Sequence, residues 1–136
     1  MMARAVQFTN SPVQRIDIDE ANIEWEPSVF GGNGTENRLN LVLRVSSNVL
    51  EIVRIAEQNC TSSIITNDTM KVKVEMDKVR FWSAENNLIS KPTHWRGLTV
   101  RALCEIRGFW KSKTGEGISI VCTDMQVTDN KPISPF

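Results

Sequence analysis

Aromatic and basic side chains are concentrated together in the second half of this 136-residue chain. Five of its nine aromatic residues lie between positions 81 and 110, namely Phe81, Trp82, Trp95, Phe109 and Trp110. Residues 71–113 also carry ten basic side chains against four acidic ones. A nucleic-acid base that stacks on an aromatic ring contributes about 1–3 kcal/mol, while nearby cations neutralise the phosphates. The pattern therefore predicts a surface for single-stranded nucleic acid.

The residues predicted for that surface fall into two chemical groups. The stacking candidates are Trp82, Trp95, Trp110 and Phe109. The candidates for phosphate contacts are Lys71, Lys73, Lys78, Arg80, Arg96, Arg101, Arg107, Lys111 and Lys113. Three of these cations, Arg101, Arg107 and Lys111, have the same parity along one strand, so we expect them to share a face.

Each aromatic residue has an alternative place in the core. Phe81 is in the apolar phase of its segment, which favours the core. Trp95 lies in the polar stretch Thr93–Arg96, where periodicity supports neither alternative. Phe109 and Trp110 are adjacent in a strand and must point to opposite faces, but the sequence does not say which one is exposed.

Residues that could support other chemistry are few. The single histidine, His94, has no carboxylate at a motif spacing, and no glycine-rich phosphate loop or zinc motif is present in the sequence. Asp17 and Asp19 alternate on one strand face, where they could bind a cation or simply form a solvated edge. Three widely spaced cysteines predict reduced thiols rather than disulfides. We therefore expect no catalytic residue, no metal and no cofactor.

Alternating apolar residues predict the strands that must position these side chains. Arg38–Val45 alternates cleanly, with its leucines on one face. Lys71–Met76 alternates as well, and a slip of the apolar phase near Asp77 indicates a bulge or a corner. Gly97 opens the longest strand, which the turn Lys113–Gly117 joins to a hairpin partner over Ile118–Val127.

One helix is predicted between these strands. Val49, Ile52, Val53 and Ala56 recur with helical spacing and predict a helix over Asn48–Gln58. Asn48 lies three residues before Glu51, as in a capping box. The polar alternate positions of the strands favour a small curled barrel over a buried parallel sheet. The expected fold is all-β dominated: an OB-like small β-barrel with one helix inserted in the strand series.

The expected organisation is one domain with two short extensions. Residues 14–128 form the barrel, residues 1–13 an N-terminal arm and residues 129–136 a flexible tail. Residues 1–37 carry two basic and six acidic side chains, so the formal net charge of zero hides a segregation of charge. No run approaches the ~18 apolar residues of a membrane span, and the first residues do not read as a signal peptide. We expect a soluble, intracellular protein.

The order of these features resembles a known family. The resemblance is carried by the segment Ile23–Pro27, the leucine-rich strand, the helix, the motifs Arg80–Trp82 and Trp95–Gly97, and the closing Gly115–Ile120 and Met125–Val127. With these features the chain resembles the single-stranded-DNA-binding proteins of tailed phages and other DNA viruses, including the T7-like type. The resemblance implies an OB barrel that binds and protects single-stranded DNA during viral replication, recombination or repair, without catalysis. It also implies stacking on the tryptophans and phosphate contacts to the matching arginines and lysines.

The same resemblance extends to the C-terminus. Ile133–Phe136 is similar to the Pro-Phe tip by which such proteins recruit replication partners, which implies docking through Phe136. The acidic run that usually precedes that tip is missing, because Asp129 is followed by Lys131. A homo-oligomer, most simply a dimer, is expected.

Two other classes of protein fit a small β-barrel of this composition. A viral structural or assembly protein would assemble with itself and would not bind nucleic acid in a salt-dependent way. A single-stranded RNA-binding module of the OB or cold-shock kind would prefer ribose to deoxyribose.

Overall fold

A computed structural model describes residues 14–28 and 37–129. These stretches contain eight strands and one helix, in the order β1 (Gln14–Ile23), β2 (Arg38–Val45), α1 (Ser47–Ala56), β3 (Ile65–Thr66), β4 (Thr69–Glu75), β5 (Arg80–Trp82), β6 (Leu88–Ile89), β7 (Thr99–Ser112) and β8 (Gly115–Asp129). The predicted arm, most of the predicted tail and Phe136 lie outside the described residues. No helix in the described part is long and apolar enough to span a membrane.

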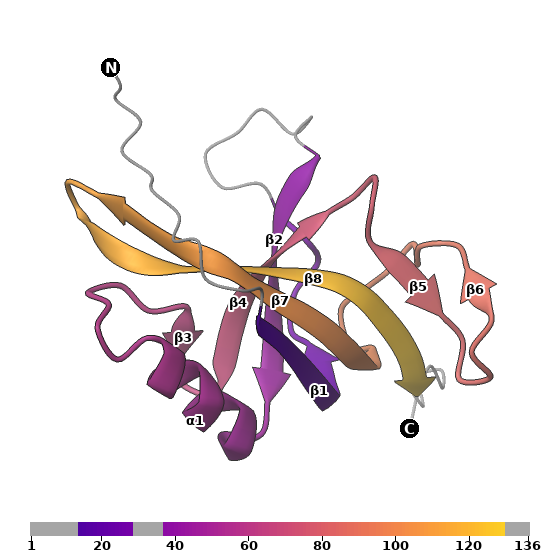
Figure 1. Cartoon of the computed structure of the whole chain (residues 1–136). Helices are drawn as coiled ribbons and strands as arrows, with labels where there is room; N and C mark the ends of the chain where they lie inside the picture. The colour runs from indigo at the N-terminus through magenta and orange to yellow at the C-terminus, as the bar shows by residue number, and fades with distance from the viewer. Residues whose placement is uncertain (1–13, 29–36, 130–136) are drawn as a thin grey trace.

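Five of the strands close on themselves as a barrel (Figure 1). β1 pairs antiparallel with β2 and with β7, β2 with β4, and β7 with β8. The ring closes where β4 and β8 run parallel, at Lys73 beside Val121 and Val74 beside Cys122. Five strands with this closure agree with the predicted OB-like barrel, including the single helix placed within the strand series.

Three short strands extend the sheet beyond the barrel. β3 pairs antiparallel with β4 at one edge. At the other edge β5 runs parallel to β8, and β6 pairs antiparallel with β5. The predicted phase slip near Asp77 is a corner: the chain turns after Glu75, and the N–H groups of Lys78 and Val79 both donate to the Glu75 carbonyl oxygen. The polar segment between Trp82 and Gly97 includes the strand β6.

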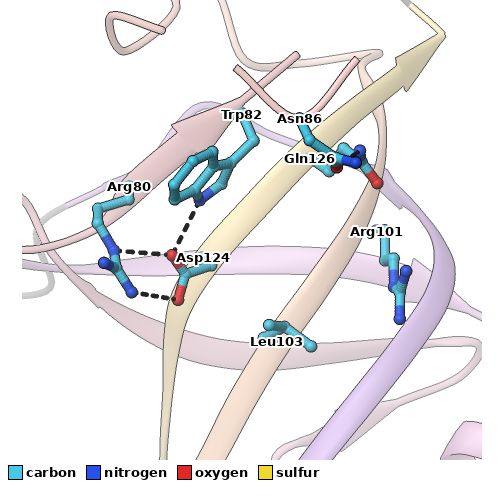
Figure 2. A pocket seen from close by; sticks show the side chains of 7 residues that line it. All are labelled: Arg80, Trp82, Asn86, Arg101, Leu103, Asp124 and Gln126. Carbon is cyan, nitrogen blue, oxygen red and sulfur yellow. Dashed lines mark hydrogen bonds and ion pairs between the residues drawn. The ribbon is translucent and has the colours of Figure 1, made fainter. Parts of the chain in front are cut away.

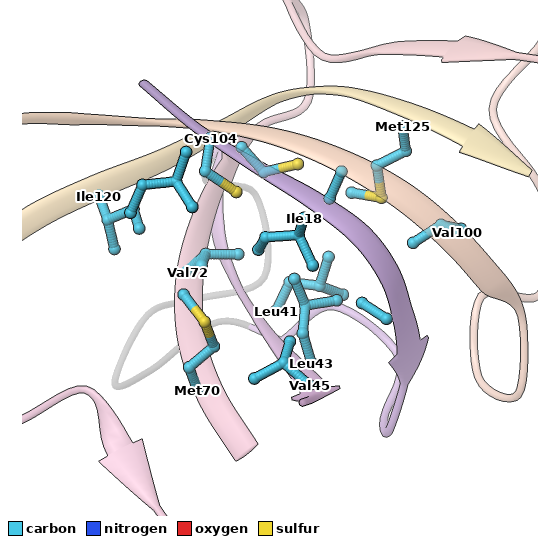
Figure 3. Close-up of a cluster of buried hydrophobic side chains, with 14 of the residues drawn as sticks. Ile18, Leu41, Leu43, Val45, Met70, Val72, Val100, Cys104, Ile120 and Met125 are labelled. Carbon is cyan, nitrogen blue, oxygen red and sulfur yellow. The ribbon is translucent and has the colours of Figure 1, made fainter. Parts of the chain in front are cut away.

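The core fills the barrel with residues from alternate positions of the five barrel strands (Figure 3). Ile18, Leu41, Val72 and Val100 are fully buried there. Phe81 is also buried, as its apolar phase predicted. The opposite positions on these strands face outward and are available for a site.

The helix forms where its spacing predicted, but not with the predicted cap. It begins after Ser46, whose side chain makes no capping hydrogen bond, so the capping box of Asn48 and Glu51 is not formed. Val49, Leu50 and Val53 are buried, whereas Ile52 is 45% exposed. Burial of one apolar side stabilises a short helix more than its cap does, and here that side includes Leu50 in place of Ile52.

The β7–β8 hairpin extends away from the barrel (Figure 1). Ser112 pairs with Gly115, so the turn is shorter than predicted and Gly115–Gly117 already belongs to β8. Trp110 lies opposite Gly117, where an added Cβ would be 2.6 Å from the indole Nε1. Gly117 thus leaves the space that the Trp110 ring occupies.

Candidate nucleic-acid interface

Four cations lie on the outward side of two neighbouring barrel strands. Residues that alternate with the buried positions of β2 and β4 point away from the core. They are Arg38, Asn40, Val42 and Arg44 of β2 and Lys71, Lys73 and Glu75 of β4. We call these seven residues the β2–β4 face. Cross-strand pairing places Arg38 opposite Glu75, Asn40 opposite Lys73 and Val42 opposite Lys71. Four positive charges therefore share this face with one carboxylate.

The β2–β4 face carries an excess of positive charge. Burial lowers the pKa of Lys73, and the nearby charges of Arg38 and Lys71 lower it further. Lys73 Nζ lies 3.4 Å from the Asn40 side-chain oxygen. Arg44 is paired with Glu24, whose two carboxylate oxygens accept from its guanidinium at 3.1 Å. A cluster whose members repel one another suits a polyanionic ligand.

Sequence reasoning named Lys71 and Lys73 but omitted Arg38 and Arg44. The omitted arginines are on the clearest alternating strand of the chain, at positions opposite in parity to its buried leucines. That alternation was the signal that could have found them. What the sequence could not supply was the pairing of β2 with β4, which brings all four cations together.

Glu75 lies at the end of this face and is shared by several cations. Its carboxylate is 3.0 Å from Arg107, 3.6 Å from Arg38 and 3.8 Å from Lys78. The hydrogen bond from Arg107 holds the pKa of Glu75 below its usual value, although partial burial opposes this. Lys78 and Arg107 line a cleft of about 320 Å³ beside Glu75, which we call the Glu75 cleft. Two more of the predicted phosphate contacts thus adjoin the β2–β4 face.

Three predicted residues meet in a second hollow, formed by β5, β7 and β8 (Figure 2). Arg80, Trp82 and Arg101 are among the residues that line it. Arg80 is ion-paired with Asp124 at 2.9 Å, and Arg101 is ion-paired with Asp17. Arg101 donates to both carboxylate oxygens of Asp17, so Asp17 is a salt-bridge partner. The same hydrogen bonding lowers the pKa of Asp17.

Trp95 is a core residue and not a stacking platform. Its side chain is 4% exposed and packs edge-on against Phe81, with the ring centroids 4.8 Å apart. The indole Nε1 donates to the Pro92 carbonyl oxygen at 2.9 Å. The stacking role predicted for Trp95 is therefore wrong, because both its ring and its polar atom have partners inside the protein.

Trp25 is the exposed tryptophan that sequence reasoning missed. Its side chain is 54% exposed, and the guanidinium carbon of Arg96 lies 4.6 Å from the ring centroid. Glu26 fixes this corner, because its carboxylate accepts the backbone N–H groups of Trp95 and Arg96 at 2.8–3.0 Å. Burial tends to raise the pKa of Glu26, but these hydrogen bonds keep it below its usual value.

The corner that carries Trp25 adjoins the β2–β4 face. The N–H of Glu24 donates to the Val42 carbonyl oxygen, and the Glu24 side chain reaches Arg44. Trp25 follows directly in the chain. A tryptophan inside an otherwise polar, acidic segment was the available signal, the same one that drew attention to Trp95.

A bulge in β7 separates the predicted row of Arg101, Arg107 and Lys111. The β7–β8 register shifts between Ile106 and Gly108, so the alternation changes phase there. Lys111 is consequently on the opposite face from Arg107, and it pairs with Glu116 at 3.4 Å. The expectation that the three cations share one face is wrong. Lys113 is exposed at the hairpin turn.

The same bulge decides between Phe109 and Trp110. Phe109 lies opposite the buried Ile118 and packs against the core, which leaves it unsuited to stacking. Trp110 lies opposite Gly117 on the other face of the hairpin. Trp110 is thus the member of the pair that remains a stacking candidate.

Comparison with known proteins gives a match in structure alone. No protein-family model matches the chain, and no curated protein matches it. A solved structure of the single-stranded DNA-binding protein from bacteriophage Enc34, a C-terminal truncation, is 12% identical with a TM-score of 0.60, covering 98% of this chain and 100% of that one. The Enc34 protein in complex with ssDNA is 10% identical with a TM-score of 0.54, covering 98% and 96%. The chain therefore shares its fold with a bacteriophage single-stranded DNA-binding protein.

Proposed function

We propose that this protein binds single-stranded DNA, without acting on it chemically, and protects it during the replication, recombination or repair of phage DNA. The observation that carries the proposal is the excess of positive charge on the β2–β4 face. OB barrels bind oligonucleotides on the corresponding face, formed by their second and third strands. Exposed Trp25, with Arg96 on its ring, adds a stacking residue at the edge of that face.

The shared fold supports the same assignment. The structure of a protein with this fold has been solved in complex with ssDNA. The β2–β4 face offers what a single strand requires: cations for its phosphates and, beside them, an aromatic ring for its bases. The role we propose for these cations and for Trp25 is therefore to hold the strand.

Several parts of the proposal concern assembly and location. We expect an intracellular protein that forms a homo-oligomer, most simply a dimer, and whose C-terminal tail recruits replication proteins through Phe136. Removal of residues 132–136 would then weaken binding to a replication protein from the same genome and leave the affinity for DNA unchanged. Unchanged affinity for every such protein would argue against docking through the tail.

Titration with defined nucleic acids tests the proposed function. Intrinsic tryptophan fluorescence is followed as oligo-dT, oligo-U or a duplex of equal length is added, at low and then at rising salt. We expect quenching by oligo-dT that weakens as salt rises, and weaker binding of oligo-U and of the duplex. Stronger binding of oligo-U would assign the protein to RNA, and no binding of any of the three at low salt would reject the proposal.

A further inference from the structure

The hollow of Figure 2 is a shaped pocket on the outer side of β7 and β8, away from the β2–β4 face. It has a volume of about 350 Å³ and is lined by Arg80, Trp82, Asn86, Arg101, Leu103, Asp124 and Gln126. We call it the Trp82 pocket. Its residues come from β5, from the turn after β5, and from β7 and β8.

Apolar surface lines part of this pocket although the pocket is on the outside of the protein. Leu103 is 43% exposed on β7 between the charged residues Arg101 and Glu105, and Trp82 lines the pocket from β5. Exposed leucine and tryptophan surface is stabilised when a flat, weakly polar group covers it. The pocket is therefore suited to a planar ring.

The pocket is held in shape by hydrogen bonds before any ligand arrives. Asp124 accepts from the Trp82 indole Nε1 at 3.0 Å and is ion-paired with Arg80, so it fixes both side chains. Gln126 Nε2 donates to the Ser83 carbonyl oxygen and to the Asn86 side-chain oxygen, at 3.2 and 2.7 Å, and fixes the turn. Binding to such a pocket loses little conformational entropy.

The charges of the pocket favour an uncharged group over a phosphate. Arg80 is paired with Asp124, and Arg101 with Asp17, so the two cations are matched by two carboxylates. The amides of Asn86 and Gln126 line the pocket and can hydrogen-bond the polar edge of a base. A nucleobase combines a flat face with such an edge.

The Trp82 pocket is connected to the β2–β4 face through the Glu75 cleft. Arg80 lines both the pocket and the cleft. Glu75, at the other side of the cleft, belongs to the β2–β4 face and contacts Arg38. Lys78 and Arg107 line the cleft between them, where a phosphate backbone would find positive charge.

We propose that the Trp82 pocket binds one unstacked nucleobase of a strand whose backbone runs from the β2–β4 face along the Glu75 cleft. The inference rests on the proposed function and adds to it a specific base-binding site. Bases inside a duplex are stacked and paired, so the pocket would favour single strands over duplexes.

Two pocket variants and one control test the inference with two ligands. Leu103→Ser removes exposed apolar surface from the pocket, Trp82→Ala removes the ring, and Ile55→Ser changes a 60% exposed residue of α1 away from it. The ligands are oligo-dT of about twelve nucleotides, within the usual range of OB folds, and an abasic strand of equal length. Thermal unfolding establishes that each variant is folded. If Trp82→Ala does not fold, Leu103→Ser alone still tests the inference.

The expected result depends on the bases being present. Loss of one base contact should weaken oligo-dT binding about tenfold in both pocket variants and leave their affinity for the abasic strand unchanged. Ile55→Ser should bind both strands with wild-type affinity. Wild-type affinity of Leu103→Ser for oligo-dT, or an equal loss for both strands, would overturn the inference while the proposed function stood. Absence of binding to both strands by the wild-type protein would overturn the proposed function and the inference with it.

Discussion

At the scale of single residues, Glu75 is the carboxylate that organises the positive surface. It contacts cations from β2, from β7 and from the corner after β4, namely Arg38, Arg107 and Lys78. Glu75 thus positions three cations with a single negative charge, and Arg107 is also paired with Glu105 at 3.3 Å. The position of Glu75 thus links the stability of the barrel to the charge of the proposed DNA site.

Replacing Glu75 by glutamine should destabilise the protein in a pH-dependent way. The folded pKa of Glu75 is below its unfolded value, so its carboxylate stabilises the fold above the ordinary glutamate pKa of about 4.3 and loses that effect as the pH falls through the folded value. We expect Glu75→Gln to lower the free energy of unfolding by about 1–3 kcal/mol at pH 7. The difference from wild type should shrink near pH 3.

Urea unfolding at several pH values measures this effect. Glu51→Gln, at an exposed position of α1, is the matched control and should behave as the wild-type protein does. A loss of stability in Glu75→Gln that is the same at pH 7 and pH 3 would show that the negative charge of Glu75 has no part in it.

Trp25 should contribute to binding and not to folding. Its ring is mostly exposed and already has Arg96 beside it, so one base can stack there close to a cation. We expect Trp25→Ala to weaken oligo-dT binding about tenfold with little change in thermal stability, and Trp25→Phe to retain most of the affinity. Equal affinities of wild type and Trp25→Ala would remove Trp25 from the site.

The sequence alone could not separate Trp25 from Trp95. Both lie in polar stretches without periodicity, and both are tryptophans next to charged residues. A tertiary contact decides which tryptophan is exposed. The Glu26 carboxylate accepts the backbone N–H groups of Trp95 and Arg96, and the Arg96 guanidinium lies over the exposed Trp25 ring. Glu26 precedes Trp95 by 69 residues and Arg96 by 70, so no local sequence pattern indicates this contact.

At the scale of secondary structure, alternation predicted the strands well and their faces less well. β2 has the predicted bounds, and the outward parity of β2 and β4 is as expected. The prediction failed on β7, where the bulge before Gly108 places Lys111 on the opposite face from Arg107. A bulge depends on pairing with the partner strand, so the parity of one strand does not reveal it.

The hairpin offers a direct test of how Trp110 is seated. Gly117→Ala places a Cβ about where the Trp110 ring lies, so the ring must move, and we expect a loss of about 1–3 kcal/mol in the free energy of unfolding. In a Trp110→Ala background the same change should cost little, because the crowding is gone. An equal cost in both backgrounds, measured by chemical unfolding, would contradict the contact.

At the scale of the whole molecule, barrel closure redistributes the charges that the sequence keeps apart. Among the described residues, two carboxylates of the acidic N-terminal segment reach cations on other strands. Asp17 pairs with Arg101 and Glu24 with Arg44, and the charges of Arg38 and Lys71 both act on Lys73. The sequence predicted a segregation of charge, but which cations are neutralised depends on strand pairings between its distant halves.

The fold class was predictable because it follows from local periodicity, whereas the site depends on how the strands pair to close the barrel. Strands that are neighbours in sequence form the β7–β8 hairpin, but β1 pairs with β7 and β4 runs parallel to β8. These long-range pairings bring the Glu75 cleft between the β2–β4 face and the Trp82 pocket. A single sequence gives no information on such pairings, so it identified many of the cations and not the surface they form.

The salt dependence of DNA binding tests the central claim most directly. The fluorescence anisotropy of labelled oligo-dT measures binding by the double variant Lys71→Ala/Lys73→Ala over a range of salt. The control is Arg54→Ala/Lys91→Ala, which removes the same charge from exposed positions away from the β2–β4 face. If the β2–β4 face holds the strand, the first variant binds more weakly and its log–log salt slope is smaller in magnitude by about 1.4, as two lost phosphate contacts require. The control keeps the wild-type slope. An unchanged slope in Lys71→Ala/Lys73→Ala would contradict the account.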